Sequence, residues 1–471
     1  MKLGAITGGD EAAVVTGFAI DHRKVAPGTV FGAFQGLRVN GEDFIPAAVQ
    51  AGAIAVVARP EAVVEGAVHI ADSNPRERFA RAAAQFFAPF PEVAVAVTGT
   101  NGKTSTVEMT RQLWRMAGFH AASIGTLGVT TADDRVTTGL TTPDVVTFLS
   151  NAAGLAREGV THVAFEASSH GLSQYRTEGL AVRAAAFTNL SRDHLDYHGD
   201  MATYFTAKLR LFSEVLDADG AAVIWADDPN SERVEDLARQ RGNRILLVGE
   251  HGDALRLVAR EPTLLGQMLT IEAEGKAHKV NLPLIGAYQA ANALVAAGLV
   301  IATGGDVAQT IANLARLQPV RGRLERAVIK PNGAPVYVDY AHTPDAIEAA
   351  IAALKPHTHG RLILVLGAGG DRDPGKREPM GQVAAQGADV VIVTDDNPRT
   401  EDPAAIRAAI LKGAPNAVEI GDRREAFSAA IDLAEPEDIV LLAGKGHEQG
   451  QIVGDLVLPF DDVSVARECV A

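Results

Sequence analysis

The chain has 471 residues, 47% of them hydrophobic and 21% charged, with a formal net charge of −15 at pH 7. This length and composition predict about two to four globular domains, and the acidic balance argues against nucleic acid or an anionic membrane as the main partner. The single cysteine, Cys469, excludes a disulfide within the chain and a cysteine-based metal site, which fits a reducing compartment.

No stretch of the chain has the pattern of a membrane segment. Residues 1–4 are not followed by the apolar core of a signal peptide, and no window of about 18 residues is apolar throughout. We therefore expect a cytoplasmic protein with no membrane partner.

Short β-like runs alternate with alanine-rich helical patterns along the chain, which predicts an α/β fold with mainly parallel sheets. The expected strands are residues 53–58, 93–97, 161–165, 184–187, 221–225, 362–366, 390–394 and 439–443. Residues 256–284 alternate more regularly and include the runs 268–273 and 278–282, which predicts an antiparallel patch.

Two proline-marked stretches, residues 87–91 and 318–323, suggest domain boundaries. We predict an N-terminal domain at 1–88, a central nucleotide-binding domain at 89–319 and a C-terminal α/β domain at 320–471.

The most informative motif follows the expected strand 93–97. The sequence Thr-Gly-Thr-Asn-Gly-Lys-Thr at 98–104 leads into a helical pattern from residue 106 to 116. A glycine-rich turn between a buried strand and a helix N-terminus is typical of a phosphate site. Lys103 would neutralise the anion and Thr104 would offer a hydroxyl to magnesium. Val97 stands where the common Walker spacing has glycine. The loop is therefore a shorter form of the phosphate-binding motif, which narrows the class of nucleotide-binding protein.

Two further polar clusters follow expected strands of the central domain. Glu166 ends one strand and, as a hard oxygen donor, is a candidate magnesium ligand; the alternative is a solvated loop acid. The cluster 188–198 contains His194, which could bind a second metal. Lys208, on the helix that follows, is typical of a helix-surface cation when read alone.

The C-terminal domain carries similar clusters. Asp339 ends a strand with His342 in the next turn, and Arg323 lies upstream, either to neutralise phosphoryl charge or in a surface ion pair with Glu325. Polar segments at 369–377, 395–399 and 444–448 also follow strands, so we expect them at one sheet edge, where they suit a zwitterionic substrate. The segment 395–399 could alternatively be a self-satisfied turn fixed by Pro398.

Taken together, these motifs resemble the Mur ligase family of ATP-dependent amide-forming enzymes over nearly the whole chain. The stretches that carry the resemblance are 21–34 with 44–46, 98–104, 141–144, 166–172, 191–199, 339–345 and 444–448. The segment Asp-Asn-Pro-Arg at 396–399 is similar to the signature of the subgroup that adds meso-diaminopimelate to UDP-N-acetylmuramoyl-L-alanyl-D-glutamate.

The resemblance implies a set of ligand contacts. ATP would contact Thr98, Gly99, Thr100, Asn101, Gly102, Lys103, Thr104, Ser105, Asn292, Arg323, Asp339 and His342. The uridine nucleotide–dipeptide would contact His22, Thr141, Thr142, Ser168, Gln174 and Arg176. The amino acid would contact Arg372, Asp396, Asn397, Pro398, Arg399, Gly444 and Glu448.

The resemblance also implies two magnesium ions, held by Thr104, Glu166, His194 and a carbamate on Lys208, which reverses the surface interpretation of that lysine. The catalytic residues would be Lys103, Glu166, His194, Lys208 and Arg323. We expect a monomer whose C-terminal domain closes over an acyl-phosphate intermediate.

Diaminopimelate is lysine with an added distal carboxylate, and Arg399 offers a planar fork for that group. Alternatives within the class are a lysine-adding Mur ligase or folylpolyglutamate synthase; more distant alternatives are a P-loop NTP hydrolase and a non-catalytic nucleotide-binding regulator. The chain departs from the family at His22, where serine is usual, and at Asn40, where aspartate is usual. Both departures concern uridine binding rather than the reaction.

Overall fold

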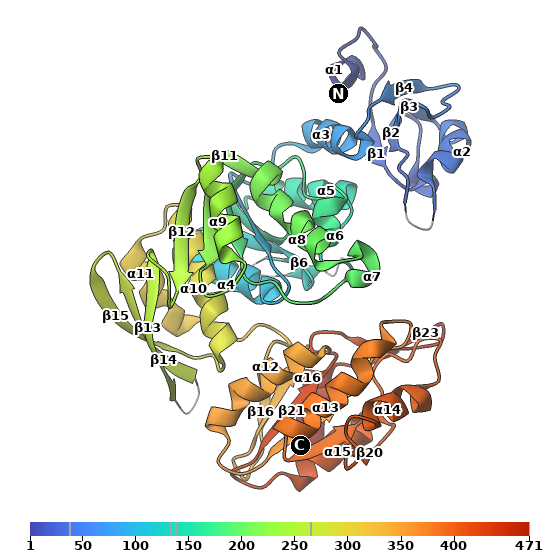
Figure 1. Cartoon of the computed structure of the whole chain (residues 1–471). Coiled ribbons are helices and arrows are strands. Elements are labelled where there is room, and N and C mark those ends of the chain that lie inside the picture. Colours follow the sequence, from blue (N-terminus) through green and yellow to red (C-terminus); the bar gives the residue numbers. More distant parts are fainter. Residues whose placement is uncertain (37–38, 132–133, 137–138, 264–265, 471) are drawn as a thin grey trace. The chain divides into compact units, whose positions relative to one another are not determined.

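A computed structural model describes residues 1–36, 39–131, 134–136, 139–263 and 266–470 (Figure 1). The chain divides into two compact units. The first unit is Met1–Leu247 with Gly298–Gly305, and the second is Val248–Ala297 with Asp306–Ala471.

The N-terminal part of the first unit is a parallel sheet of order β1-β2-β3-β4. Its strands are β1 (Gly17–Ala19), β2 (Thr29–Gly32), β3 (Ala53–Ala58) and β4 (Val68–Ala71). Its helices are α1 (Gly4–Thr7), η1 (His22–Lys24), η2 (Gly41–Phe44), α2 (Ile45–Gln50) and α3 (Pro75–Phe87). Phe79 of α3 is fully buried in the core beside Val30 and Val57. The continuous apolar run of β3 fits a strand covered on both faces.

The rest of the first unit is built on a mostly parallel sheet whose strands follow the order β11-β10-β5-β9-β6-β7-β8. These strands are β5 (Val93–Thr98), β6 (Ala121–Gly125), β7 (Gly128–Thr130), β8 (Arg135–Val136), β9 (His162–Glu166), β10 (Val182–Phe187) and β11 (Leu216–Trp225). The helices are α4 (Lys103–Met116), α5 (Val145–Arg157), α6 (Ser169–Ser173), α7 (Leu195–His198), α8 (Met201–Arg210), η3 (Leu211–Val215) and α9 (Ser231–Gln240). Strand β12 (Arg244–Gly249) and helix α10 (Ala287–Ala302) each contain residues of both units.

The second unit begins with an antiparallel meander of β13 (Leu255–Thr263), β14 (Gly266–Ala273) and β15 (Lys276–Leu282). Residues of β14 alternate between buried and partly exposed, as a sheet with one covered face requires. This confirms the predicted antiparallel patch, apart from residues 264–265, which lie outside the described part of the chain. Helices α11 (Val307–Asn313) and η4 (Leu314–Arg316) follow.

A six-stranded sheet of order β16-β17-β21-β18-β19-β20 forms the rest of the second unit, with only β16 antiparallel. Its strands are β16 (Glu325–Ile329), β17 (Pro335–Asp339), β18 (Leu362–Leu366), β19 (Val390–Val393), β20 (Val418–Glu419) and β21 (Ile439–Ala443). Its helices are α12 (Pro344–Leu354), η5 (Lys355–His357), η6 (Pro374–Lys376), α13 (Arg377–Gly387), α14 (Pro403–Leu411), α15 (Arg423–Leu433) and α16 (Asp462–Val470). A two-stranded hairpin, β22 (Gly450–Val453) and β23 (Leu456–Pro459), lies outside this sheet.

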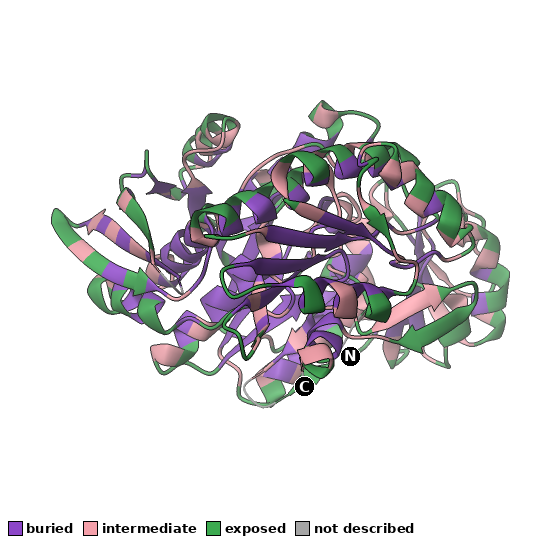
Figure 2. Cartoon of the chain, turned by 90° about the horizontal axis from the view of Figure 1, so that it is seen from below, coloured by how far each residue is buried: buried purple, intermediate pink, exposed green. Residues whose placement is uncertain are grey.

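Separate apolar cores cover the two faces of the six-stranded sheet. One contains Leu354 of α12, Met380 of α13 and Ile410 of α14; the other contains Phe427 of α15 and Val463 of α16. Figure 2 shows the resulting pattern of buried strands and helices with one exposed side. Because the parallel strands share a direction, the segments after β17, β18, β19 and β21 all leave the sheet at one edge, where ligands bind in such folds.

All eight expected strands are present, with bounds that shift by a few residues at most in seven of them; β11 begins five residues earlier than expected. The α/β prediction is therefore confirmed, whereas the predicted domain boundaries at residues 88 and 319 stay predictions. No helix among the described residues has the length and apolarity needed to cross a membrane.

Candidate active site

The phosphate loop is a tight turn between β5 and α4. Gly99 has φ +144° and Gly102, the N-cap of α4, has φ +86°. A Cβ on Gly99 would lie 1.9 Å from the Thr188 hydroxyl oxygen, so only glycine fits. The loop is tied to the segment after β10, because the backbone N–H groups of Thr100 and Asn101 both donate to Asn189, at 2.9 and 2.8 Å.

Two lysines meet at one carbonyl of this loop. Lys103 Nζ donates to Gly99 O at 2.9 Å and to Thr100 O at 2.7 Å, and Lys208 Nζ donates to Gly99 O at 2.7 Å. Lys208 is 1% exposed and lies 4.4 Å above the Tyr204 ring. Burial, reinforced by the charge of Lys103, holds the pKa of Lys208 well below its usual range.

The surface interpretation of Lys208 is therefore wrong. Its side of α8 faces the phosphate loop rather than solvent, which the single residue could not show. Tyr204, which also contacts the Thr100 hydroxyl at 3.2 Å, is a residue that sequence reasoning missed.

Glu166 ends β9 directly beside this loop, since β5 and β9 are neighbours and Val97 is opposite Glu166 in their register. The residue is 2% exposed. Its carboxylate accepts from the backbone N–H of Thr126 at 2.7 Å and from the Thr126 hydroxyl at 3.2 Å. Gly125 makes room for it, because a Cβ there would lie 2.3 Å from a Glu166 oxygen. The alternative of a solvated loop acid is therefore wrong.

His194 precedes α7 in the left-handed conformation, with φ +53°. Its Nε2 lies 3.4 Å from an Asp193 carboxylate oxygen, and its ring is 4.9 Å from that of His170. Burial and then the charges of Lys103 and Lys208 lower the pKa of His194, although Asp193 opposes them. A neutral imidazole keeps a lone pair that can bind a metal ion.

The residues expected to bind the uridine nucleotide–dipeptide form one polar network next to Glu166. Thr142 donates to the Glu166 carbonyl at 2.8 Å, and its hydroxyl oxygen lies 2.9 Å from the Ser168 hydroxyl oxygen. Arg176 donates to the Thr142 carbonyl at 2.9 Å and to Gln174 Oε1 at 2.8 Å.

The same network reaches Thr141 through the Thr126 hydroxyl at 3.0 Å, and Tyr197 through the Gln174 amide at 2.9 Å. Tyr197 and Thr126 were not predicted, although Tyr197 lies within a polar cluster that the sequence singled out. His22 lies instead in η1, in the N-terminal part of the first unit, where its ring stacks on Phe44 with centroids 4.5 Å apart.

The second unit gathers the other residues expected to contact ATP. Asp339 ends β17 and accepts from the backbone N–H of Leu324 at 2.6 Å. The Arg323 guanidinium lies 4.6 Å from the centre of the Tyr340 ring, and His342 Nδ1 is 2.7 Å from the Tyr340 carbonyl.

Helix α10 completes this set. It carries Asn292, which is buried, and Gln289, whose amide donates to the Arg323 carbonyl at 2.9 Å. Gln289 and Tyr340 were not predicted. A Glu325 oxygen accepts from the backbone N–H of Gly322 at 2.8 Å, and the alternative ion pair of Arg323 with Glu325 stays a prediction.

Segments after β18, β19 and β21 meet at the sheet edge, as predicted. Asn397 Nδ2 donates to Glu448 at 2.7 Å, and Arg399 Nη1 donates to the Gly370 carbonyl at 2.7 Å. The fully buried Lys445 donates to Asn397 Oδ1 at 2.8 Å and lies 3.5 Å from Asp396.

The other residues expected to contact the amino acid differ in burial and in their distance from the polar groups of this edge. Gly444 has φ +120°, and a Cβ there would lie 2.6 Å from an Asp396 oxygen. Pro398 is buried, whereas Arg372 is exposed on the loop after β18. Because the polar groups of 396–399 bond to distant segments, the alternative of a self-satisfied turn is wrong. Lys445 was missed as a site residue because its motif offered no reason to bury a cation.

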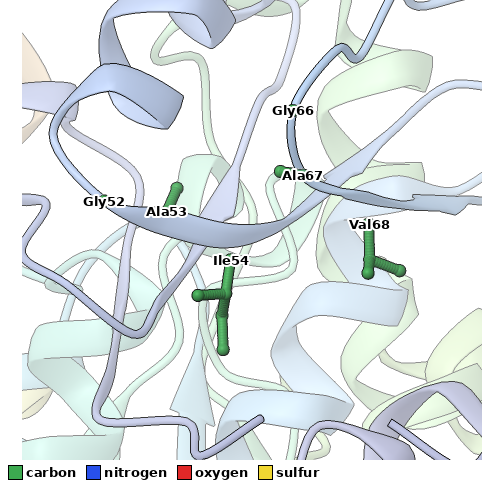
Figure 3. A pocket seen from close by; sticks show the side chains of 6 residues that line it. All are labelled: Gly52, Ala53, Ile54, Gly66, Ala67 and Val68. Atoms are coloured by element: carbon green, nitrogen blue, oxygen red, sulfur yellow. The ribbon is translucent and has the colours of Figure 1, made fainter.

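A shallow, open hollow lies elsewhere (Figure 3). It has a volume of about 600 Å³ and is lined by Gly52, Ala53, Ile54, Gly66, Ala67 and Val68, around β3 and β4. None of the predicted site residues lines it, and it offers only backbone and small apolar side chains. The polar networks, rather than this hollow, are the candidate active site. Within the described residues, no group of three or more His, Cys, Asp or Glu side chains forms a ready metal cluster.

Comparison with known proteins gives the same picture along the chain. Residues 14–92 match the Mur ligase family catalytic domain, residues 97–300 the Mur ligase middle domain, and residues 322–446 the Mur ligase glutamate ligase domain. A protein from Zymomonas mobilis named UDP-N-acetylmuramoyl-L-alanyl-D-glutamate–2,6-diaminopimelate ligase is 62% identical over 460 residues, covering 97% of this chain and 95% of the relative.

Two solved structures extend the comparison. One of a UDP-N-acetylmuramoyl-L-alanyl-D-glutamate–2,6-diaminopimelate ligase has a TM-score of 0.74 and 32% identity, covering 100% of this chain and 98% of its own. The MurF ligase from Thermotoga maritima in complex with ADP has a TM-score of 0.63 and covers 98% of both chains. At 20% identity, the second likeness shows the fold alone.

Proposed function

The chain belongs to the Mur ligase family, and from this premise we infer which reaction its residues carry out. It is an ATP-dependent ligase that adds meso-2,6-diaminopimelate to UDP-N-acetylmuramoyl-L-alanyl-D-glutamate in peptidoglycan precursor synthesis. The 62% identity to a relative of that name over 97% of the chain carries this conclusion. The loop 396–399, held at the sheet edge beside Glu448, supports the choice of amino acid.

The reaction has two balanced steps. The D-glutamyl carboxylate attacks the γ-phosphorus of ATP, which forms an acyl phosphate and releases ADP. The amine of diaminopimelate then attacks the acyl carbon, loses a proton and expels phosphate from a tetrahedral intermediate. We assign to Lys103 and Arg323 the stabilisation of charge on the transferring phosphoryl group.

The residues around Glu166 fit a magnesium site. A buried carboxylate, the hydroxyl of Thr104 and the neutral imidazole of His194 supply oxygen and nitrogen donors near the phosphate loop. Bound there, magnesium would neutralise phosphate charge. A carbamate on Lys208, formed from the amine and carbon dioxide with loss of a proton, would replace a cation by an oxygen donor. We propose that these four residues hold two magnesium ions.

We assign the remaining residues by the same premise. The nucleotide would contact residues 98–105 together with Asn292, Arg323, Asp339 and His342. The dipeptide-bearing nucleotide would contact the network of Thr141, Thr142, Ser168, Gln174 and Arg176, with His22 at the uridine end. Arg399 would hold the distal carboxylate of diaminopimelate and Glu448 the neighbouring ammonium, with Arg372, Asp396, Asn397, Pro398 and Gly444 around them. The chain would act as a monomer in the cytoplasm.

The test is phosphate release with ATP, magnesium and UDP-N-acetylmuramoyl-L-alanyl-D-glutamate, comparing meso-diaminopimelate with L-lysine as acceptor. We expect release with diaminopimelate only. In the matched variant Arg399→Lys, which keeps the charge but loses the fork, the preference for diaminopimelate should fall at least tenfold. Phosphate release with L-lysine but not with diaminopimelate would contradict the proposed acceptor and still support a ligase. Phosphate release without any acceptor would favour an NTP hydrolase.

A further inference from the structure

The β22–β23 hairpin has little apolar packing to hold it in place. All four residues of β23 are exposed, and Leu456 and Val457 are 65% and 68% exposed. A two-stranded hairpin is marginal by itself in water. Its position must therefore come from the segment that it contacts.

That segment is the loop 396–399, to which the hairpin makes four hydrogen bonds. Gln451 Nε2 donates to the Asp396 carbonyl at 2.8 Å, and the backbone N–H of Ile452 donates to Asn397 Oδ1 at 2.9 Å. The Arg399 N–H donates to the Ile452 carbonyl at 3.0 Å, and the Gly454 N–H donates to the Arg399 carbonyl at 2.7 Å.

These bonds hold Arg399 in a backbone conformation that it would not favour alone. Its φ is +53°, in the left-handed region that non-glycine residues seldom adopt. Both of its backbone polar groups are bonded to the hairpin, while its guanidinium donates to the Gly370 carbonyl at 2.7 Å. The hairpin thus fixes the backbone position from which the Arg399 side chain extends.

The hairpin also fixes the orientation of the Asn397 amide. Asn397 Oδ1 accepts from both Ile452 N–H and Lys445 Nζ, so Nδ2 is left facing Glu448, to which it donates at 2.7 Å. Two side chains assigned to the acceptor, Arg399 and Glu448, are therefore positioned through the hydrogen bonds that the hairpin makes to the Arg399 backbone and to Asn397.

We propose that the β22–β23 hairpin is a positioning element for the amino-acid acceptor, acting through Gln451 and the backbone of Ile452. This inference rests on the proposed function, because it concerns residues assigned to diaminopimelate. Its consequence is specific: a weakened hairpin should impair acceptor binding and selection while ATP binding is retained.

The test uses two variants of the full chain. Gln451→Ala removes the bond to the Asp396 carbonyl from a partly exposed position. Ile452→Pro removes the N–H that Asn397 accepts, and it spares the ladder to β23 because the Ile452 N–H and carbonyl both face the loop. Val457→Thr is the matched control, since Val457 is exposed on the same hairpin and changes little in shape.

We expect Gln451→Ala and Ile452→Pro each to raise the KM for meso-diaminopimelate about threefold to tenfold, as the loss of one neutral hydrogen bond predicts. Their preference for diaminopimelate over L-lysine should fall, while the KM for ATP and the melting temperature of Gln451→Ala stay at the unaltered values. The control should behave like the unaltered protein.

Two results would overturn the inference. One is a KM for diaminopimelate that stays unchanged in both variants. The other is a parallel rise in the KM for ATP and for diaminopimelate with a lower melting temperature, which would indicate general loosening. If the unaltered protein accepts only L-lysine, the proposed acceptor fails, and the KM for lysine in the same variants then tests the hairpin separately.

Discussion

Asp339 is a carboxylate that the fold keeps away from water at the end of a strand. Burial raises its pKa to about 6, although the charge of Arg323 and the backbone N–H groups of Leu324 and Ala341 oppose the shift. An acid whose pKa is higher in the folded than in the unfolded chain binds its proton more tightly when folded. Its contribution to stability is therefore complete below about pH 4 and is lost as the pH rises through about 6.

We expect the variant Asp339→Asn to remove this pH dependence. Relative to the variant, the free energy of unfolding of the unaltered chain should fall by about 2 kcal/mol between pH 4 and pH 7. Urea unfolding of both proteins across that range measures the difference and cancels the effect of the other carboxylates. Parallel profiles would show that Asp339 titrates normally.

At this same scale, sequence reasoning identifies residue types better than their partners. The strand ends that carry Glu166 and Asp339 were visible because an apolar run stops at an acid. The neighbours of those acids, Thr126 and Leu324, come from segments about 40 and 15 residues away in the chain. Lys208 shows the limit most clearly, since a lysine read alone suggests a helix surface, whereas its side chain is buried against the phosphate loop.

At the scale of elements, the turn between β5 and α4 depends on one position without a side chain. Gly99 has a left-handed φ and lies against Thr188, so the loop and the segment after β10 can approach closely. The hydrogen bonds from Thr100 and Asn101 to Asn189 depend on that approach.

Gly99→Ala should therefore reduce activity in addition to straining the backbone. We expect at least a hundredfold loss of kcat/KM for phosphate release, because shifting the loop by the size of a methyl group misplaces Lys103. The matched control is Gly118→Ala, at φ +91° with no neighbour within 4 Å of the added Cβ, which should cost only about 1 kcal/mol of stability. Thermal unfolding and initial rates of phosphate release are measured for both variants. Equal losses of activity in the two would show that the close approach of Gly99 to Thr188 is not the cause of the loss.

The same scale shows why the sheets were predictable and the hairpin was not. Strands such as β18 and β21 are apolar runs of five residues covered on both faces, a pattern that depends only on local sequence. The β22–β23 hairpin has exposed side chains and is held by polar bonds to a loop about 50 residues earlier. No periodicity in residues 450–459 signals that partner.

At the scale of the whole molecule, the residues proposed to contact ATP are divided between two compact units. Lys103 belongs to the first and Arg323 to the second. A single nucleotide that engages both would restrict the motion of one unit against the other. It would also shield an acyl phosphate from water.

We therefore expect the radius of gyration to fall when an ATP analogue and both other substrates are added. Small-angle scattering of the free and saturated protein measures this change. The variant Arg323→Ala, which keeps the first unit intact, should show less compaction at the same ligand concentrations. An unchanged radius of gyration at saturation would refute domain closure.

The carbonyl oxygens of Gly99 and Thr100 both accept hydrogen bonds from the Lys103 ammonium. Both oxygens belong to the turn itself, so the turn supplies its own hydrogen-bond acceptors for this cation. Departure of ADP would require an exchange of hydrogen-bond partners rather than the refolding of a loop. A polyphosphate with several charged oxygens can displace the two carbonyls from the Lys103 ammonium. A weakly charged anion competes poorly with them for the same hydrogen bonds.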